Sequence, residues 1–174
     1  MSRTRQIYKG RIVDLRLEEI RLPNQVTTTI EMIRHPGAAA VVPLHDDGEV
    51  TLLHQFRHAA GGFIWEIPAG TLNSGEEPRR CAARELQEEA GLTARELIAL
   101  GSVFTAPGFC DERIHLFLAR GLTPTAQALD HDEVLSLRRL PLAQALAMIH
   151  SGEIEDAKSI AGLYRAAEYV RRNA

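Results

Sequence analysis

The alternation of hydrophobic and polar residues predicts that the first third of the chain is mostly β-structure. Apolar and polar positions alternate within residues 11–20, as they do in a half-buried strand, and a Pro-Asn turn separates this segment from a strand rich in Thr and Ile at Val26–Ile33. The uninterrupted apolar run Ala38–Leu44 predicts a strand that is buried on both faces. An Asp-Asp-Gly turn follows, and we expect Val50–Phe56 to return as the hairpin partner of that strand.

A helical period first appears after Glu77. Pro78 suits the first position of a helix, an apolar stripe recurs every three or four residues up to Ala90, and Gly91 suits a left-handed C-terminal cap. The remaining pattern predicts strands at 103–105, 114–119 and 134–140, and helices at 141–149 and 157–171. The predicted fold class is therefore mixed α/β, of the α+β type, with more strands than helices.

Composition and charge narrow the class of protein. With 174 residues, 45% of them hydrophobic and 25% charged, the chain has the size and make-up of one ordinary globular domain. Its 20 Lys and Arg residues against 23 Asp and Glu give a net charge of −3, which argues against a nucleic-acid-binding protein. The longest uncharged run, residues 97–110, is too short for a membrane span, and the N-terminus lacks the apolar core of a signal peptide. With only two cysteines, the chain is unlike a disulfide-rich secreted protein, so we expect a cytoplasmic location. Together with the charge and the short uncharged run, this gives the expectation of no nucleic-acid or membrane partner.

Three glutamates gather on one face of the predicted helix. Glu85 lies three residues before Glu88 and four before Glu89, so their carboxylates share a face and repel one another. A divalent cation would remove that repulsion, because Mg²⁺ and Mn²⁺ prefer carboxylate oxygens, and Arg84 would brace the cluster. A solvated helix with a Glu-rich outer face is the alternative that the helix alone leaves open.

The glutamates belong to a longer pattern between Gly70 and Leu92. Gly70 and Gly75 have the spacing of a P-loop, but Glu76-Glu77 stands where that loop needs Lys followed by Ser or Thr. The segment instead matches, at every specified position, the Nudix box G-x5-E-x7-R-E-U-x-E-E-x-G-U, in which U is an aliphatic residue. The matching residues are Gly70, Glu76, Arg84, Glu85, Leu86, Glu88, Glu89, Gly91 and Leu92.

The sequence therefore resembles the Nudix hydrolases, which use Mg²⁺ or Mn²⁺ to cleave nucleoside diphosphates linked to another group. This resemblance implies the Nudix fold, in which a mixed β-sheet is sandwiched between helices. Three further segments are similar to the ADP-ribose pyrophosphatase subfamily, namely Gln55–Arg57, Trp65–Gly70 and Thr105–Glu112. The implied reaction is hydrolysis of the pyrophosphate linkage of ADP-ribose, which gives AMP and ribose 5-phosphate.

The resemblance also implies roles for individual residues. The implied metal ligands are Glu85, Glu89, the backbone carbonyl of Ala69 and, as a second-tier ligand, Glu88. Arg84 and Glu76 are expected to orient the loop and the helix. Glu112 matches the loop glutamate that is proposed as general base, or as an additional metal contact, in this subfamily. The implied catalytic set is Glu112, Glu85, Glu89, Glu88 and Arg84.

Two further residues are candidate substrate ligands. The guanidinium of Arg57 suits phosphate oxygens, and we expect it to hold a phosphate or the terminal ribose. Glu66 would orient Arg57 or contact the substrate itself. Structural roles are the alternatives: a surface salt bridge for Arg57, a purely structural role for Glu66 and an ordinary loop carboxylate for Glu112.

The resemblance divides the chain into two parts. Residues 1–36 would form N-terminal antiparallel strands that mediate homodimerisation and contact the substrate base, and residues 37–174 would form the Nudix hydrolase domain. Arg34 and the strand Ile30–Ile33 are candidates for the base contacts. A β-rich segment of this length cannot bury both of its faces alone, which also favours a homodimer. The open alternatives are a Nudix hydrolase acting on a GDP- or UDP-sugar or a dinucleotide, and a non-catalytic Nudix-fold ligand sensor.

Overall fold

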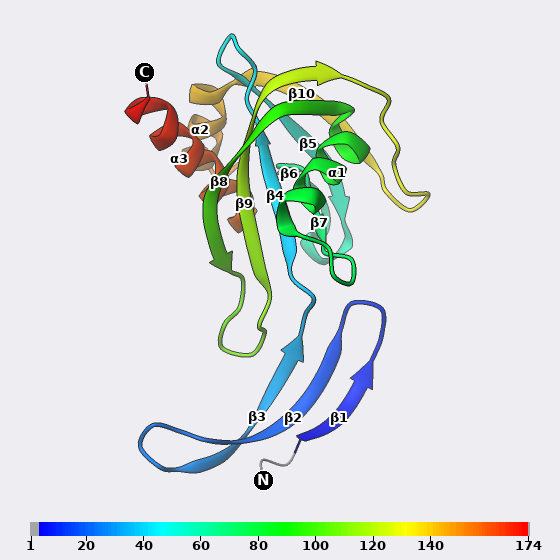
Figure 1. The fold of residues 1–174 in the computed structure, drawn as a ribbon, viewed down its shortest axis with the longest axis vertical. Coiled ribbons are helices and arrows are strands. Elements are labelled where there is room, and N and C mark those ends of the chain that lie inside the picture. The colour runs from blue at the N-terminus through cyan, green and yellow to red at the C-terminus, as the bar shows by residue number, and fades with distance from the viewer. Residues whose placement is uncertain (1–3, 174) are drawn as a thin grey trace.

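The computed structural model describes residues 4–173, which form ten strands and three α-helices (Figure 1). The strands are β1 (Thr4–Lys9), β2 (Asp14–Arg21), β3 (Thr27–Arg34), β4 (Ala38–Pro43), β5 (Glu49–Arg57), β6 (Gly62–Glu66), β7 (Ala69–Thr71), β8 (Leu92–Phe104), β9 (Arg113–Pro124) and β10 (Leu135–Pro141). The helices are α1 (Pro78–Ala90), α2 (Leu142–Ser151) and α3 (Ala157–Arg172), with a short 3-10 helix at His58–Ala60. No helix within residues 4–173 is both long and apolar enough to cross a lipid bilayer.

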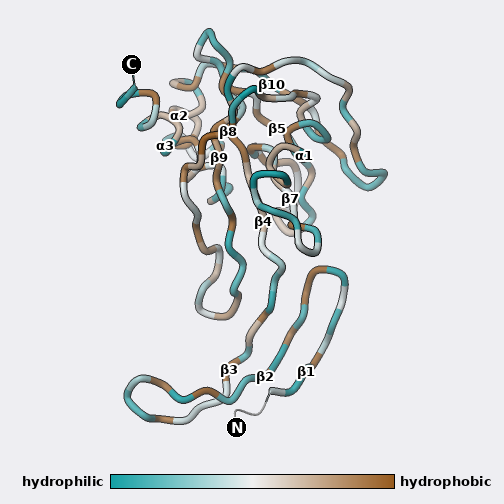
Figure 2. Tube along the Cα trace, in the orientation of Figure 1, coloured by the Kyte–Doolittle hydropathy of each residue, from teal (hydrophilic) through white to brown (hydrophobic). Residues whose placement is uncertain are grey.

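The first three strands form a separate antiparallel sheet below the rest of the molecule (Figure 1). Hydrophobic and hydrophilic stretches alternate along all three strands (Figure 2), and no side chain in residues 4–34 is fully buried. The predicted N-terminal antiparallel extension is therefore confirmed. Strand β1 was not predicted, because its sequence is mainly polar and it is defined by its pairing with β2 rather than by a hydrophobic pattern.

The central sheet has the order β7-β4-β9-β8 and carries the main core on both of its faces. Successive residues of β4 point to opposite sides, so Ala38, Ala40 and Val42 join one cluster with α3, and Ala39 and Val41 join the other with α1. Strand β4 is therefore completely buried, as its apolar run predicted. A mixed sheet between helices is the architecture that the sequence predicted, since β4 runs parallel to β9 and antiparallel to β7.

The predicted hairpin between β4 and β5 is wrong. Both edges of β4 are occupied, one by β7 and the other by β9, so no edge remains for β5. A single antiparallel bridge between Leu44 and Val50 joins the two segments at their turn. Beyond it, β5 leaves for a second sheet of order β10-β5-β6.

Strand β8 is much longer than the predicted segment at 103–105. It pairs with β9 along its whole length from Leu92 to Phe104, with one irregularity between Ala99 and Gly101. Gly101 has a φ of +91°, a conformation that favours glycine. Because glycine in a sequence normally indicates a turn, the residues before it were not predicted to belong to the same strand. Thr105 lies just beyond the strand, in the loop that leads to Glu112.

Candidate active site

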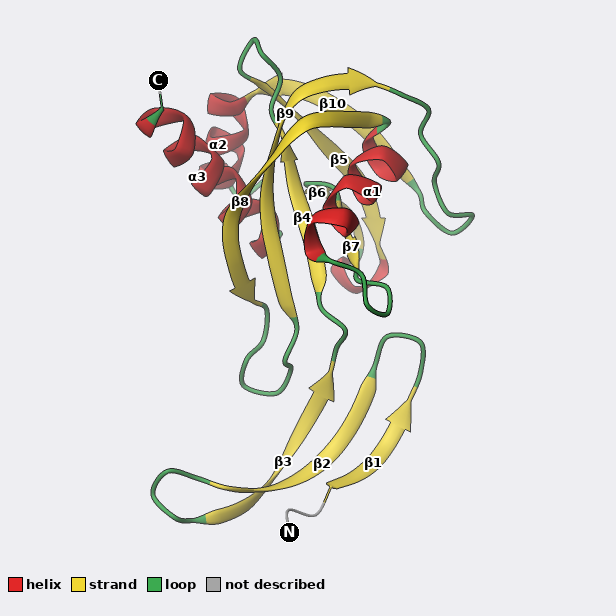
Figure 3. Ribbon diagram, viewed as in Figure 1, coloured by secondary structure: helices red, strands yellow, loops and turns green. Residues whose placement is uncertain are grey.

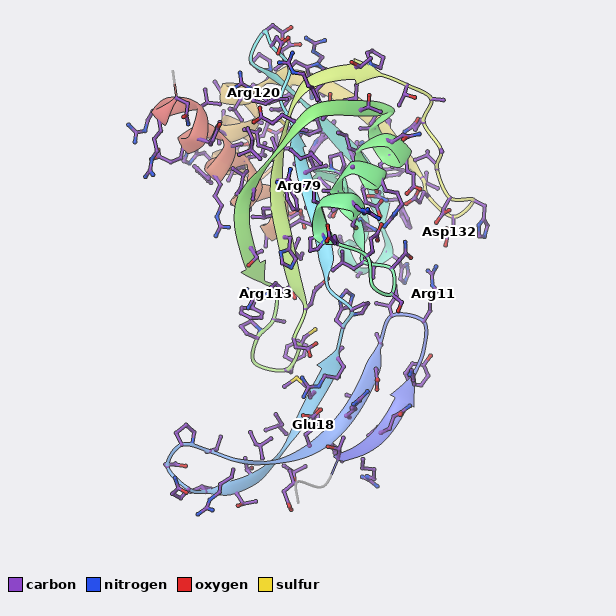
Figure 4. All side chains as sticks on the ribbon, viewed as in Figure 1. Arg11, Glu18, Arg79, Arg113, Arg120 and Asp132 are labelled. Atoms are coloured by element: carbon purple, nitrogen blue, oxygen red, sulfur yellow. The ribbon has the colours of Figure 1, made fainter. Side chains whose placement is uncertain are left out.

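A cavity of about 950 Å³ opens where α1, β7 and the loop before β9 meet. The turn between β1 and β2 contributes Arg11 to its wall, and Figure 4 shows this side chain directed from the N-terminal sheet toward the rest of the molecule. The start of α3 contributes Lys158. All eight residues that the sequence nominated as ligands or catalytic groups line the cavity: Arg57, Glu66, Ala69, Arg84, Glu85, Glu88, Glu89 and Glu112.

The glutamates reach the cavity because α1 begins and ends where the sequence places its signals. Pro78 occupies the first turn, and Gly91 closes the helix in the left-handed conformation with a φ of +61°. Strand β7 lies directly against the helix. A Cβ atom on Gly70 would lie 1.8 Å from Oε1 of Glu85, so only glycine leaves room for that carboxylate.

Arg84 binds three carboxylates at once. Its Nε and Nη2 donate to the two oxygens of Glu76 at 3.0 and 3.1 Å. Its Nη1 donates to Glu85 Oε1 at 2.5 Å and to Glu88 Oε2 at 2.9 Å. These hydrogen bonds raise the pKa of Arg84, and the bond from Arg84 lowers the pKa of Glu76. Arg84 thus braces the acidic cluster, and Glu76 holds Arg84 from the loop before the helix.

Glu89 is the most deeply buried acid of the cluster. The residue is only 1% exposed, and its carboxylate accepts a hydrogen bond from the Ala69 N–H at 2.7 Å. Burial raises the pKa of Glu89 to about 8, although the Ala69 N–H works in the opposite direction. Burial also raises the pKa of Glu85, with Arg84 opposing the shift. For both carboxylates, the neighbouring donors therefore offset only part of the cost of burying a negative charge.

This shortage of positive charge fits a divalent cation. Glu85, Glu88 and Glu89 supply the hard oxygen donors that Mg²⁺ and Mn²⁺ prefer. Burial disfavours the charged forms of Glu85 and Glu89, and a bound cation would favour them. Within residues 4–173, no three acidic, His or Cys side chains already converge as a preformed cage. Instead, the Arg84 guanidinium lies among the carboxylates of Glu76, Glu85 and Glu88. It therefore neutralises part of their negative charge.

A second charged cluster forms another part of the wall. The buried carboxylate of Glu66 accepts from Arg57 Nε at 2.7 Å through one oxygen and from Lys158 Nζ at 2.5 Å through the other. Lys158 also pairs with Asp156, the N-cap residue of α3, at 3.0 Å. Within residues 4–173, Nη1 and Nη2 of Arg57 have no hydrogen-bond acceptor, so these groups are available to a phosphate or a ribose.

Glu112 lies in the loop between β8 and β9. Its Oε1 is 3.6 Å from Nδ1 of His35, which is too long for a hydrogen bond. Nδ1 of His35 instead accepts the Gly37 N–H at 3.0 Å and therefore carries no proton of its own in this arrangement. The Glu112 carboxylate is about one-quarter exposed and is directed at the cavity without a strong side-chain partner.

Sequence reasoning missed some residues of this wall and nominated others that do not line it within a single chain. Lys158 and Asp156 were not nominated, although Lys158 is one of only two lysines in a chain rich in arginine and follows an N-cap signal. Arg34 and the strand at 30–33 were candidates for base contacts, but within a single chain none of them lines the cavity. Arg34 is instead paired with Glu18 and Asp111.

Comparison with known proteins identifies the family. The sequence model of the NUDIX domain matches residues 34–163, which include the whole acidic helix and the Glu112 loop. The chain belongs to the Nudix family. The resemblance found in the sequence is therefore confirmed, and the Nudix assignment covers the central sheet, α2 and the beginning of α3.

Two relatives cover most of this Nudix chain. The ADP-ribose pyrophosphatase of Bacillus subtilis (strain 168) is 42% identical over 156 residues, which are 88% of this chain and 84% of that protein. The methanol dehydrogenase activator of Bacillus methanolicus is also 42% identical, over 160 residues, 91% of this chain and 86% of that protein. The predicted assignment to the Nudix pyrophosphatases is confirmed by the family match and the first of these relatives.

A solved structure shares the fold. The crystal structure of an ADP compounds hydrolase superposes with a TM-score of 0.85 and covers 99% of this chain and 94% of its own. The two sequences are 21% identical, so the likeness concerns the fold alone. It confirms the predicted Nudix fold, including a mixed sheet enclosed by helices.

Proposed function

We propose that this Nudix enzyme hydrolyses ADP-ribose to AMP and ribose 5-phosphate with Mg²⁺ or Mn²⁺ as its cofactor. The observation that carries the proposal is the meeting of two buried carboxylates, Glu85 and Glu89, with the free guanidinium edge of Arg57 on one cavity wall. Arg57 is close enough to favour the charged form of Glu89. Such a wall suits a cation and a phosphate chain together, and the relative from Bacillus subtilis carries the name of this activity.

The proposed cation ligands are Glu85, Glu89, the Ala69 carbonyl and, as a second-tier ligand, Glu88. The bound cation supplies positive charge that offsets the charge of the pyrophosphate and makes attack by water easier. Glu112 accepts the proton that the attacking water loses. The new phosphorus–oxygen bond forms as the bond between the same phosphorus and the bridging oxygen breaks, and that oxygen leaves with the other phosphate.

The remaining polar groups position the substrate and the ligands. Arg57 binds a phosphate or the terminal ribose through Nη1 and Nη2, while Glu66 holds its Nε. Arg84 keeps Glu85 and Glu88 in place and shares their charge with Glu76. This division of roles explains why Arg57 has a free guanidinium edge, whereas the guanidinium of Arg84 is taken up by carboxylates.

We also propose that residues 1–36 serve dimerisation and base binding, and residues 37–174 hydrolysis. The N-terminal sheet is a single layer of three strands without a core of its own. It exposes apolar side chains that a second copy would cover: Ile7, Tyr8, Ile12, Val13 and Val26. Arg11 and Ile12 bring the same sheet to the cavity. A monomeric mass in light scattering at micromolar protein would contradict the proposed homodimer.

The proposed compartment is the cytoplasm. Both cysteines are free thiols, and Cys81 is packed against β7, where burial raises its pKa to about 12 and makes it unreactive. A chain with no need for a disulfide suits a reducing compartment. The proposed small-molecule partner is a nucleoside diphosphate derivative rather than a nucleic acid or a membrane.

The test is a substrate panel. ADP-ribose, NADH, diadenosine polyphosphates and UDP- and GDP-sugars are each incubated with Mg²⁺, with Mn²⁺ and with a chelator, and the products are resolved by phosphorus NMR. We expect the highest kcat/KM with ADP-ribose, AMP and ribose 5-phosphate as products, and no turnover with the chelator. A higher kcat/KM for a nucleotide sugar or a dinucleotide would replace the proposed substrate, and no turnover with any substrate would favour the ligand sensor.

A further inference from the structure

The loop that carries Glu112 rests on the N-terminal sheet. The Ile33 N–H donates to the Phe109 carbonyl at 2.7 Å, and the Asp111 N–H donates to the Ile33 carbonyl at 3.2 Å. Ile33 and Cys110 thereby form a parallel bridge outside the regular sheets. Figure 3 shows that this loop, which joins β8 to β9, extends toward the end of β3. The loop is therefore joined to the sheet by its backbone as well as to the strands on either side.

Side chains reinforce this junction. Nη1 of Arg34 donates to Asp111 Oδ2 at 2.8 Å, while its Nε and Nη2 donate to the two oxygens of Glu18 at 2.9 and 2.6 Å. Asp111 Oδ1 accepts the His35 N–H at 2.8 Å. Figure 4 shows Glu18 on the N-terminal sheet, remote from α1. One guanidinium thus connects strand β2 to the residue next to Glu112.

Arg34 and Asp111 favour each other's charged form. Burial raises the pKa of Asp111, but Arg34 and the His35 N–H outweigh it and leave the pKa below the ordinary value. Hydrogen bonds to Glu18 and Asp111 raise the pKa of Arg34. Bidentate pairing between an arginine and a carboxylate fixes orientation as well as distance. The hydrogen bonds of Arg34 to Glu18 and Asp111 therefore give the junction a defined geometry.

We infer that Arg34 and Asp111 are positioning residues for Glu112, and that the N-terminal sheet thereby sets the place of the catalytic carboxylate. The inference rests on the proposed role of Glu112 in proton transfer. Within residues 4–173, the Glu112 side chain has only a 3.6 Å contact with His35. Its backbone accepts the Thr105 N–H and donates to Cys110 Sγ, both at 3.4 Å, so the place of the carboxylate depends on the backbone of the loop that Asp111 anchors. A misplacement of about 1 Å at a reacting group can cost about a hundredfold in rate.

The first variant is Arg34→Met in the full-length protein, assayed with ADP-ribose and saturating Mg²⁺. We expect kcat to fall by about ten- to a hundredfold while KM changes by less than about twofold, because Arg34 does not line the cavity. Amide hydrogen exchange in residues 105–112 should become faster. The matched control is Arg16→Met, which removes an Arg–Asp pair from the same sheet without touching the loop and should leave both readouts unchanged.

A double variant separates a positioning role from a general loss of structure. If Arg34 acts through Glu112, Arg34→Met should slow the Glu112→Gln enzyme no further. Multiplicative effects, or an unchanged kcat in Arg34→Met, would overturn the inference. If Glu112→Gln alone keeps the wild-type rate, the proposed role of Glu112 fails, and the inference falls with it. In that case the substrate panel still reports on the rest of the proposed function.

Asp111→Asn guards against a folding defect in Arg34→Met. It leaves one acceptor oxygen where two are now used, by Arg34 and by the His35 N–H, and it removes the charge of the pair. Its expected result is the same fall in kcat, with unfolding still cooperative and KM unchanged. A wild-type kcat in Asp111→Asn, together with faster exchange of residues 105–112, would show that the junction orders the loop without positioning Glu112.

Discussion

Lys158 Nζ lies 2.5 Å from Oε1 of Glu66 and joins the first turn of α3 to the end of β6. The other oxygen of this carboxylate accepts Arg57 Nε at 2.7 Å. This carboxylate, in a residue that is only 3% exposed, therefore has two cationic partners, Arg57 and Lys158. The pairing also means that a helix far along the chain determines how Arg57 is presented to the cavity.

Removing Lys158 should weaken both the fold and substrate binding. We expect Lys158→Met to lower the free energy of unfolding by about 3 kcal/mol, because it leaves a buried charge short of a partner, and to raise KM for ADP-ribose through a less ordered Arg57. Urea denaturation and steady-state kinetics measure the two effects. The double variant Lys158→Met/Glu66→Gln should regain part of the lost free energy of unfolding, but its KM should stay raised. The exposed Arg171–Glu168 pair supplies the control, since Arg171→Met should leave stability unchanged.

Glu85→Gln and Glu89→Gln should each lower kcat by about two or more orders of magnitude while the protein still folds. Each change removes a carboxylate that we assign to the cation, yet keeps the size of the side chain. Turnover with ADP-ribose and the circular dichroism spectrum are measured together. Near wild-type turnover in both variants would exclude the proposed ligand set.

The raised pKa of Glu89 makes the stability of the metal-free protein depend on pH. Since the folded state holds this proton up to a pH of about 8 and the unfolded chain releases it near its ordinary value of 4.5, the free energy of unfolding should fall as pH rises between these limits. The slope is at most about 1.4 kcal/mol per pH unit for one proton.

Thermal unfolding with a chelator between pH 5 and pH 8.5 tests this dependence. Glu89→Gln should flatten the profile and be more stable than the wild type at pH 8. Added Mg²⁺ should raise the Tm of the wild type more at pH 8 than at pH 5.5, because the ligands bind a cation only in their charged form. A wild-type profile that rises from pH 5 to pH 8 would contradict the assigned burial effect.

Gly70→Ala should damage catalysis more than folding. The new Cβ would stand 1.8 Å from the Glu85 carboxylate, so that side chain must move away from its place beside Arg84. We expect a loss of kcat of about a hundredfold or more. Gly62→Ala is the matched control, because a Cβ there meets no atom within 4 Å, and its kcat should equal that of the wild type.

The parts that the sequence could predict are those with local signals. Pro78, Gly91 and the three- and four-residue spacing of Glu85, Glu88 and Glu89 all lie within one helix, so its bounds and its acidic face follow from the pattern alone. The family resemblance added the residues around it. All eight nominated residues line one cavity, although their chemical roles remain predictions.

The parts that failed depend on partners far apart in the chain. Strand β5 was assigned to β4 because nearby strands commonly pair, but β9 and β7 already occupy both edges of β4. Lys158 reaches Glu66 across 92 positions, and Arg34 reaches Asp111 across 77. No local spacing rule can anticipate such contacts, because they exist only after the sheets are assembled.

The parallel pairing of β4 with β9, in which Ala38 lies opposite Ile114, has a consequence for biosynthesis. A chain emerging from the ribosome can pair β1, β2 and β3 early, since each is adjacent in sequence to the next. The apolar strand β4 can pair with β7 once that strand is made, but its other edge waits for β9, and during that interval the nascent chain exposes an apolar strand with an unpaired edge. The three N-terminal strands are therefore synthesised before the Glu112 loop that docks on them.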